Sequence, residues 1–396
     1  MKLNQLISKK YILYGSSIVF TRGIEMLILF FAAHYFSKQE YGSLEYYKKF
    51  IEVASTFFSF GFPALILSYT KNRDSKVYLY YFSLIFVVAL AILSIPFLYY
   101  FNLLFLLIPF LFYAVFFTGS ITQSYVLVLR GSTKTSYYKI VVSLLFYILV
   151  FILIKFYHVS EFAYVYPAYF LSPLLLIGIF TEYKKQKVSF KILKKYTRLF
   201  KKLLLSSLSL VASTFGNMMF LYTDIFVLKL LSQKPNIEIA NYSFALNISN
   251  ILLLIPLTLV QVDIEKLKKS VKYVRVLNKK ILLLLVVATL FLLGFYKIIT
   301  LQFFYKYEDT YKLFLFILLA KFIQSQTPLF GTYMLIKKKF KVSLKINIFV
   351  LILNIFLSYY LYLQIGIYGV AIASIFSLLV RYLAFIILLR RNNYYA

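Results

Sequence analysis

The feature that most constrains this chain is the recurrence of apolar runs of about 20 residues along its whole length. A helix of that length is about 30 Å long, which matches the hydrocarbon thickness of a bilayer. The runs are solid rather than alternating, which is typical of membrane helices and not of barrel strands. Because 62% of the 396 residues are hydrophobic, the chain is predicted to be an all-α polytopic membrane protein.

About twelve spans are expected, joined by short loops. Their approximate ranges are 11–36, 46–69, 77–100, 103–129, 137–157, 161–181, 203–231, 239–262, 281–300, 311–335, 342–363 and 366–389. With the N-terminus in the cytoplasm, most of the 44 Lys and Arg residues fall on the cytoplasmic side, as the positive-inside rule requires. Both termini are therefore predicted to be cytoplasmic. The net charge of +31 is interpreted as an orientation signal rather than as a nucleic-acid surface.

The longest loop lies near the middle of the chain and separates six spans from six. We predict an N-terminal six-helix lobe over 1–181 and a C-terminal six-helix lobe over 203–396. Between them, 182–202 is predicted to be a basic amphipathic linker helix on the cytoplasmic membrane surface. Because both groups start on the same side, the lobes would be parallel repeats related by an axis along the membrane normal.

The first span carries two charges near its middle, Arg22 and Glu25. They are three residues apart, so they share one face of a helix. A charge at that depth costs roughly 2–3 kcal/mol or more and is expected to face protein or water rather than lipid. The pair could be a structural one that neutralises itself. It could also be one wall of a polar cavity inside the bundle.

Polar stripes on other spans favour the cavity. The strongest stripes belong to the first, second, seventh and eighth spans, which occupy corresponding places in the two halves. The substrate-binding candidates are Arg22, Glu25, Glu52, Ser213, Asn217, Asp224, Asn247, Asn250 and Lys321. The alternative is that the Ser and Asn side chains only hydrogen-bond neighbouring helices, and that Asp224 reaches the outer membrane interface.

Several chemistries are not supported by the sequence. It has no Cys, which excludes disulfides and thiolate metal sites, and it has no phosphate-binding loop motif. The first outer loop holds Glu40 and Glu45, the acids that a membrane glycosyltransferase would use, but it is too short to build an active site. We therefore expect no enzyme, no catalytic residue, no metal and no bound cofactor.

Three stretches of the sequence resemble one family. The first is AAHYFSKQEYGSLEYYKKFIEVASTFFSFGFPALI, with the Glu40-Tyr41-Gly42 turn and Gly61-Phe62-Pro63. The second is Asp224 followed by IANYSFALNISNILLLIP, and the third is Asn354-Ile355 with the run from Gly366 to Ala371. In order and spacing they are similar to the Wzx-type polysaccharide flippases of the MOP (multidrug/oligosaccharidyl-lipid/polysaccharide exporter) superfamily.

The resemblance implies two six-helix lobes that work by alternating access. It implies the transfer of undecaprenyl-diphosphate-linked oligosaccharide from the inner to the outer leaflet of the bacterial inner membrane, for O-antigen, capsule or similar surface glycan. The implied partners are this lipid-linked oligosaccharide, membrane lipid, and a glycan polymerase with other assembly proteins. No nucleic acid is expected.

The resemblance also suggests roles for the embedded charges. Arg22 would contact the diphosphate. Members of this family that carry diphosphate-linked glycans tend to have a cationic cavity, and this chain differs from them in three embedded acids, Glu25, Glu52 and Asp224. These acids could carry a coupling proton or Na⁺. Two alternatives stay open. One is a MATE-like exporter of drugs or other small molecules, and the other is a lipid-linked sugar transferase or polymerase.

Overall fold

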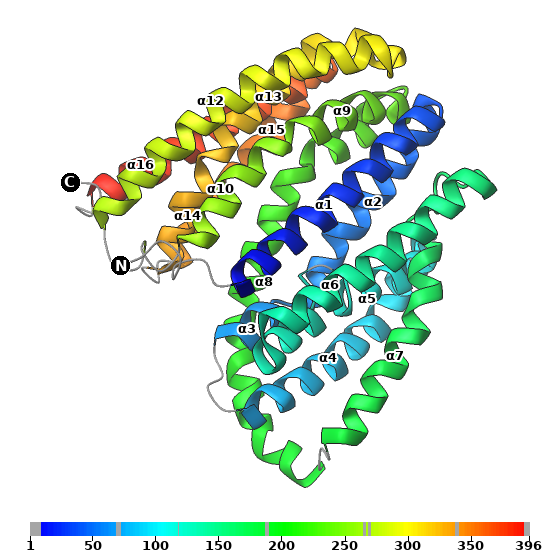
Figure 1. The fold of residues 1–396 in the computed structure, drawn as a ribbon, viewed down its shortest axis with the longest axis vertical. Coiled ribbons are helices and arrows are strands. Elements are labelled where there is room, and N and C mark those ends of the chain that lie inside the picture. The colour runs from blue at the N-terminus through cyan, green and yellow to red at the C-terminus, as the bar shows by residue number, and fades with distance from the viewer. Residues whose placement is uncertain are drawn as a thin grey trace. The chain divides into compact units, whose positions relative to one another are not determined.

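A computed structural model describes residues 9–68, 73–117, 119–186, 190–263, 267, 271–336 and 340–391. In these ranges every regular element is a helix (Figure 1). The helices of the first half are α1 (Lys9–Tyr35), α2 (Lys38–Ser59), α3 (Phe62–Ser68), α4 (Arg73–Tyr100), η2 (Leu104–Leu106), α5 (Leu107–Val115), α6 (Ile121–Tyr157) and α7 (Tyr166–Gln186). Those of the second half are α8 (Phe190–Leu231), α9 (Pro235–Ser249), α10 (Ile251–Val262), α12 (Val271–Gln302), η3 (Tyr305–Thr310), α13 (Tyr311–Ser325), α14 (Thr327–Ile336), α15 (Phe340–Ile365) and α16 (Ile367–Arg391).

Each of the predicted spans coincides with a helix or with part of a pair of helices. Within the described residues, 8 helices are long and apolar enough to cross a membrane. Long apolar side chains stay exposed on α4 and α12, for example Leu93 (76%) and Phe291 (67%). This exposure is expected of helices that face lipid. The prediction of an all-α polytopic membrane fold is therefore confirmed.

Helix α6 holds the last part of the predicted fourth span and the whole of the fifth. It turns at Gly131, whose backbone has φ 81° and ψ 174°, a left-handed conformation that only glycine adopts without strain. Beyond the turn, the Tyr138 hydroxyl donates to the Phe116 carbonyl at 2.8 Å. Phe116 follows the end of α5, so this bond ties the part of α6 beyond Gly131 back to the end of α5, and the chain folds back between the two.

Four spans are interrupted partway along their length. Among the described residues, the breaks fall at Phe60–Gly61, between the end of α5 at Val115 and the start of α6 at Ile121, at Asn250 and at Gln326. They lie in the second and the fourth span of each half, so the same pattern of breaks occurs twice. Pro63 and Pro328 are each the second residue of the helix that follows a break, a place where the missing N–H of proline costs no hydrogen bond.

The linker predicted over 182–202 is not a separate helix. Helix α7 continues to Gln186, and α8 runs from Phe190 to Leu231 as one helix of 42 residues; residues 187–189 lie outside the described part. The reason is local, since no Gly or Pro occurs between Phe190 and Gly216 to end the helix. The basic segment is thus the N-terminal part of the helix that contains the seventh span. Its place at the membrane surface stays a prediction.

The chain divides into two compact units. The first unit comprises 1–31 and 47–218, and the second comprises 32–46 and 219–396. The ranges differ from the predicted lobes in two places. The hairpin 32–46, between α1 and α2, belongs to the second unit, and the later boundary falls inside α8. Helices α1, α2 and α8 therefore each contribute residues to both units.

Each unit has its own apolar core. In the first, α4, α5, α6 and α7 pack together, and Phe112 of α5 stacks on Phe146 of α6 with ring centroids 5.5 Å apart. In the second, Phe220, Ala320 and Leu378 form a buried cluster with Val350. Aromatic pairs of this kind add to the gain from burial because edge and face charges are complementary. These cores hold the polar side chains described below in fixed positions.

Candidate functional site

Four side chains of the first unit form a continuous chain of ion pairs. Arg22 of α1 donates from Nη1 to Glu25 Oε2 at 2.6 Å. Lys48 of α2 lies 2.7 Å from Glu25 Oε1 and 3.1 Å from Glu52 Oε1. The structure thus brings together three predicted residues, Arg22, Glu25 and Glu52, through a lysine that was not predicted.

The chain of charges runs from the interior to the surface of the first unit. The side chain of Lys48 is 2% exposed, those of Glu25 and Glu52 are 9% and 14% exposed, and that of Arg22 is 50% exposed. Buried charges are tolerated only when they are paired with good geometry. The interior members therefore satisfy one another and hold the half-exposed Arg22 guanidinium in place. A guanidinium presents donors in a planar fork that matches phosphate or carboxylate oxygens.

Sequence reasoning missed Lys48 and its neighbour Lys49, because their position suggested the outer end of the second span. Both are only 2% exposed. The signal was present, since Lys48 precedes Glu52 by four residues and such residues meet on one helix face. With Lys49 included, the group has three bases and two acids, which leaves it one positive charge. The balance of embedded charge in the first unit is therefore more positive than the predicted site residues indicated.

Tyrosines enclose this group of charges. The Lys48 ammonium lies 5.9 Å from the centre of the Tyr164 ring, within the range of a cation–π contact. Tyr113 and Tyr147 are also buried, at 7% and 3% exposure, and both lie within electrostatic range of Glu25 and Lys48. Large aromatic walls with few polar groups are typical of ligand sites.

The second unit contains a separate polar cluster centred on Asp224 of α8. Ser374 Oγ lies 2.9 and 2.8 Å from the two carboxylate oxygens, and Asn354 Nδ2 donates to Oδ1 at 3.3 Å. Tyr242 also donates to the carboxylate. All four side chains are buried, so Asp224 is enclosed by protein and is not exposed at the surface of the second unit. The partners come from α9, α15 and α16, and three donors thus converge on one carboxylate.

The Asp224 cluster is rich in oxygen, with one carboxylate, one amide and two hydroxyl groups. Hard cations such as Na⁺ prefer ligands of this kind. In the described part of the chain, no three His, Cys, Asp or Glu residues gather into a metal-binding group. Lys321 of α13 donates to Gln324 at 2.8 Å and lies within electrostatic range of Asp224. Two predicted site residues, Asp224 and Lys321, are thus near one another.

The remaining candidates occupy different places. Asn247 of α9 donates to Glu45 at 2.7 Å and to Tyr41 at 3.2 Å, so it fastens the start of α2 inside the second unit. Asn250 lies at the break between α9 and α10. Ser213 and Asn217 lie on α8, but their side chains are outside the described part of the structure.

The two acids considered for a transferase have structural roles. Glu40 accepts from the Ser37 N–H at 2.9 Å while the Glu40 N–H donates to Ser37 Oγ at 3.3 Å. This reciprocal pair is a capping box at the start of α2. Glu45 is fully buried and accepts from Tyr41 at 2.9 Å. Neither is placed as a reactive acid at an open surface.

Solved structures of a flippase and of transporters share this fold. The structure is similar to that of "Lipid II flippase MurJ, inward closed conformation", with a TM-score of 0.65 and 16% identity over 96% of this chain and 87% of that one. It is also similar to the Vibrio cholerae MATE transporter VcmN in its bent form, with a TM-score of 0.55 and 14% identity over 97% and 96%. A third similar structure is a MOP superfamily transporter from Pyrococcus furiosus, with a TM-score of 0.51 and 13% identity over 96% and 96%.

Sequence comparison gives the family. The model of the family described as polysaccharide biosynthesis protein matches residues 7–264, which is well over half of the chain. The chain belongs to this family of multi-pass membrane proteins. No curated protein matches the sequence.

Proposed function

We propose that this protein is a flippase of the bacterial inner membrane that moves polyprenyl-diphosphate-linked oligosaccharide from the cytoplasmic to the outer leaflet. The observation that carries the proposal is the half-exposed Arg22 guanidinium, held at the end of a buried chain of ion pairs. An arginine fixed in this way is suited to bidentate contact with a diphosphate. Membership of the polysaccharide biosynthesis family and the likeness of fold to a lipid II flippase support the same substrate class.

In the proposed mechanism, the diphosphate and sugars leave the cytoplasmic interface by contacting polar side chains of the protein, while the polyprenyl tail stays in the bilayer. Moving a diphosphate through hydrocarbon is very costly because its charge loses its hydration. Arg22 replaces part of that hydration with fixed donors. The lipid-linked oligosaccharide would then be available at the outer leaflet to a polymerase and other assembly proteins, which would build it into O-antigen, capsule or a similar glycan.

Asp224 is proposed as the site of ion coupling in the second unit, with Na⁺ or a proton as the coupling ion. Its carboxylate is buried and is surrounded by hydroxyl and amide groups from three other helices. Glu25 and Glu52 are already engaged with Lys48, which makes them less available for this role. Dependence of transport on an ion gradient, and its loss in an Asp224 variant, tests this proposal.

The experiment is a comparison of Arg22 variants in cells that depend on this protein for surface glycan. Arg22→Ala should abolish surface glycan while the protein stays in the membrane at its normal level, because a donor to the diphosphate is lost. Arg22→Lys should retain part of the glycan, since it keeps the charge but not the planar fork. Lys134→Ala, an exposed basic residue of α6, is the control and should be normal.

Two outcomes would contradict the proposal. Normal glycan in Arg22→Ala would remove the diphosphate role. Normal glycan after deletion of the whole protein, together with reduced efflux of dyes or antibiotics, would instead favour a MATE-like exporter.

A further inference from the structure

Lys139 of α6 is a buried base that the ion-pair chain does not include. The predicted topology counts Lys139 among the cytoplasmic basic residues that orient the chain, but in the structure the residue is only 6% exposed. Within the described part of the chain, no carboxylate and no hydrogen-bond acceptor is paired with its ammonium. The stem of the side chain is buried, but the ammonium is not among the buried atoms, as is usual for a lysine that keeps its charged end in water. An ammonium held at the mouth of a pocket without a protein partner is a candidate for binding an anion.

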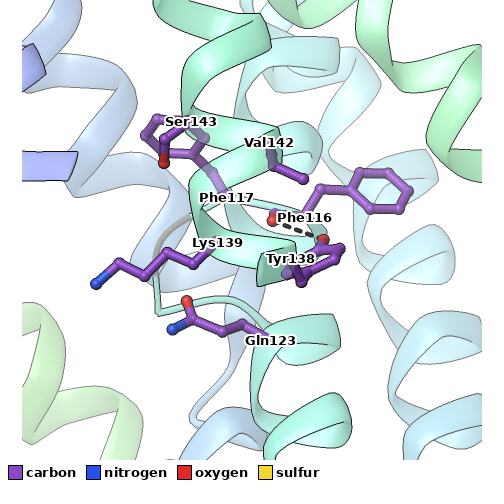
Figure 2. A pocket seen from close by; sticks show the side chains of 7 residues that line it. All are labelled: Phe116, Phe117, Gln123, Tyr138, Lys139, Val142 and Ser143. Atoms are coloured by element: carbon purple, nitrogen blue, oxygen red, sulfur yellow. Dashed lines mark hydrogen bonds between the residues drawn. The ribbon is translucent and has the colours of Figure 1, made fainter. Parts of the chain in front are cut away.

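Lys139 lines a narrow pocket beside the break between α5 and α6 (Figure 2). The pocket is formed by Phe116, Phe117, Gln123, Tyr138, Lys139, Val142 and Ser143. Gln123 and Lys139 are 16 positions apart, so a straight helix would separate them by about 24 Å along its axis. The turn at Gly131 brings both residues to one pocket.

Gln123 is held in a defined orientation. Ser120 caps α6 and accepts from the Gln123 N–H at 3.2 Å, while Gln123 Oε1 accepts from the Gly119 N–H at 2.6 Å. The arrangement is related to a capping box. Because the amide oxygen is used in this way, its NH₂ group is left to point outward as a donor. In Figure 2 the ends of the Gln123 and Lys139 side chains extend to the same side of the pocket.

A second cation acts on this position. The positive charge of Arg22 lies within electrostatic range of Lys139, and both residues belong to the first unit. Like charges in a partly desolvated place repel each other. An anion bound between them would relieve the repulsion and would also satisfy the Lys139 ammonium.

We infer that Lys139 and Gln123 form a phosphate-binding subsite that acts together with Arg22. The ligand chemistry is the oxygens of a phosphate or diphosphate ester. Resting on the proposed function, Arg22 contacts one phosphate of the diphosphate, and Lys139 with Gln123 contacts the other. The narrow pocket holds the stems of these side chains, and the phosphate binds at its open side.

Binding of two probes to the full-length protein in phosphatidylcholine nanodiscs tests the subsite. The probes are inorganic diphosphate and farnesyl diphosphate, and the measurement is Kd by isothermal titration. Lys139→Met should weaken binding by about 10- to 100-fold, the cost of one charge-assisted hydrogen bond, and Lys139→Gln should do the same. Lys139→Arg should bind within a few-fold of the unsubstituted protein. The control Lys134→Met, on the exposed face of the same helix, should bind normally.

The two probes distinguish the sources of the phosphate. Binding of farnesyl diphosphate but not of inorganic diphosphate assigns the subsite to a lipid headgroup, and equal binding of both assigns it to the free anion as well. The subsite is refuted if Lys139→Met and Lys139→Gln bind as tightly as the unsubstituted protein, or if neither probe binds. If those variants bind normally while Arg22→Ala does not, the subsite fails and the proposed function stands.

Discussion

At the scale of single residues, the structure turns an isolated pair of charges into a network. Arg22 and Glu25 are neighbours by helical spacing, and their pairing was a direct consequence of the sequence. Lys48 joins this pair to Glu52 across two helices, α1 and α2. It is the member whose removal should matter most, because it contacts both acids and is the most deeply buried.

The stability of Lys48 variants tests the network. Lys48→Met should lower the free energy of unfolding by about 3–5 kcal/mol, because it leaves buried carboxylates without their partner. Adding Glu52→Gln should recover part of the loss, since one uncompensated charge is then removed. The measurement is thermal unfolding of the purified protein, with Lys134→Met as the exposed control. A loss below about 1 kcal/mol, typical of a surface ion pair, would show that the network is not structural.

The residues around Asp224 illustrate what the sequence could not predict. Its partners Tyr242, Asn354 and Ser374 lie 18, 130 and 150 positions away. Local periodicity can place a side chain on one face of its own helix, but it cannot say which faces of different helices meet. That pairing follows from the packing of α8, α9, α15 and α16. By contrast, Lys48 could have been predicted, since its relation to Glu52 is local.

At the scale of elements, the hairpin 32–46 is the part whose position was least expected. It packs in the second unit, where Lys306 donates to the carbonyl of His34 at 3.2 Å and Asn247 donates to Glu45. The start of α2 also approaches α9 so closely that a Cβ on Gly42 would lie 1.7 Å from the Asn236 carbonyl oxygen. Glycine is therefore required here by backbone contact.

Substitution of Gly42 tests this close contact. Gly42→Ala should force α2 away from α9 and cost about 1–3 kcal/mol of stability, as overpacking does. The matched control is Gly23→Ala in α1, where an added Cβ meets nothing within 4 Å. That change should be neutral or stabilising by up to about 1 kcal/mol, because alanine favours the helix. Equal Tm values for the two variants would contradict the close packing.

Elements were the most predictable scale, because the length of an apolar run is a local property. The helices follow the expected spans. The breaks within four of these spans were not predicted, although Pro63 and Pro328, each the second residue after a break, are local signals for two of them. The linker was predicted wrongly as a separate helix, because charge suggested a surface location while nothing in 190–215 ends a helix. The placement of the hairpin 32–46 in the second unit could not be predicted from its own sequence, because it depends on contacts with residues far away along the chain.

At the scale of the whole molecule, the two polar clusters suggest a division of labour. The first unit holds the cationic group with Arg22, Lys48 and Lys49, and the second holds the Asp224 cluster. A transporter must couple substrate movement to a source of free energy, and an ion gradient supplies it only if an ion binds one conformation better than another. We therefore expect substrate contact and ion coupling to be separable by mutation.

Ion coupling makes a specific prediction about Asp224. Asp224→Asn keeps the size and polarity of the side chain but removes its charge. In proteoliposomes, the unsubstituted protein should move the lipid-linked oligosaccharide faster when a Na⁺ or proton gradient is imposed. The rate of the variant should be the same with the gradient and without it. Whichever ion stimulates transport is the coupling ion. Stimulation of the variant equal to that of the unsubstituted protein would remove Asp224 from this role.

Transfer of a lipid-linked oligosaccharide is measured most directly as its movement across the bilayer of proteoliposomes. A fluorescent polyprenyl-diphosphate oligosaccharide is placed in one leaflet, and its arrival in the other is followed by accessibility to a membrane-impermeant lectin. Transfer should need the protein, and its rate should fall by about tenfold or more in Arg22→Ala, as expected when a charge-assisted contact is lost. Transfer at the rate of protein-free liposomes, or equal rates with Arg22 and with Ala at this position, would contradict this prediction.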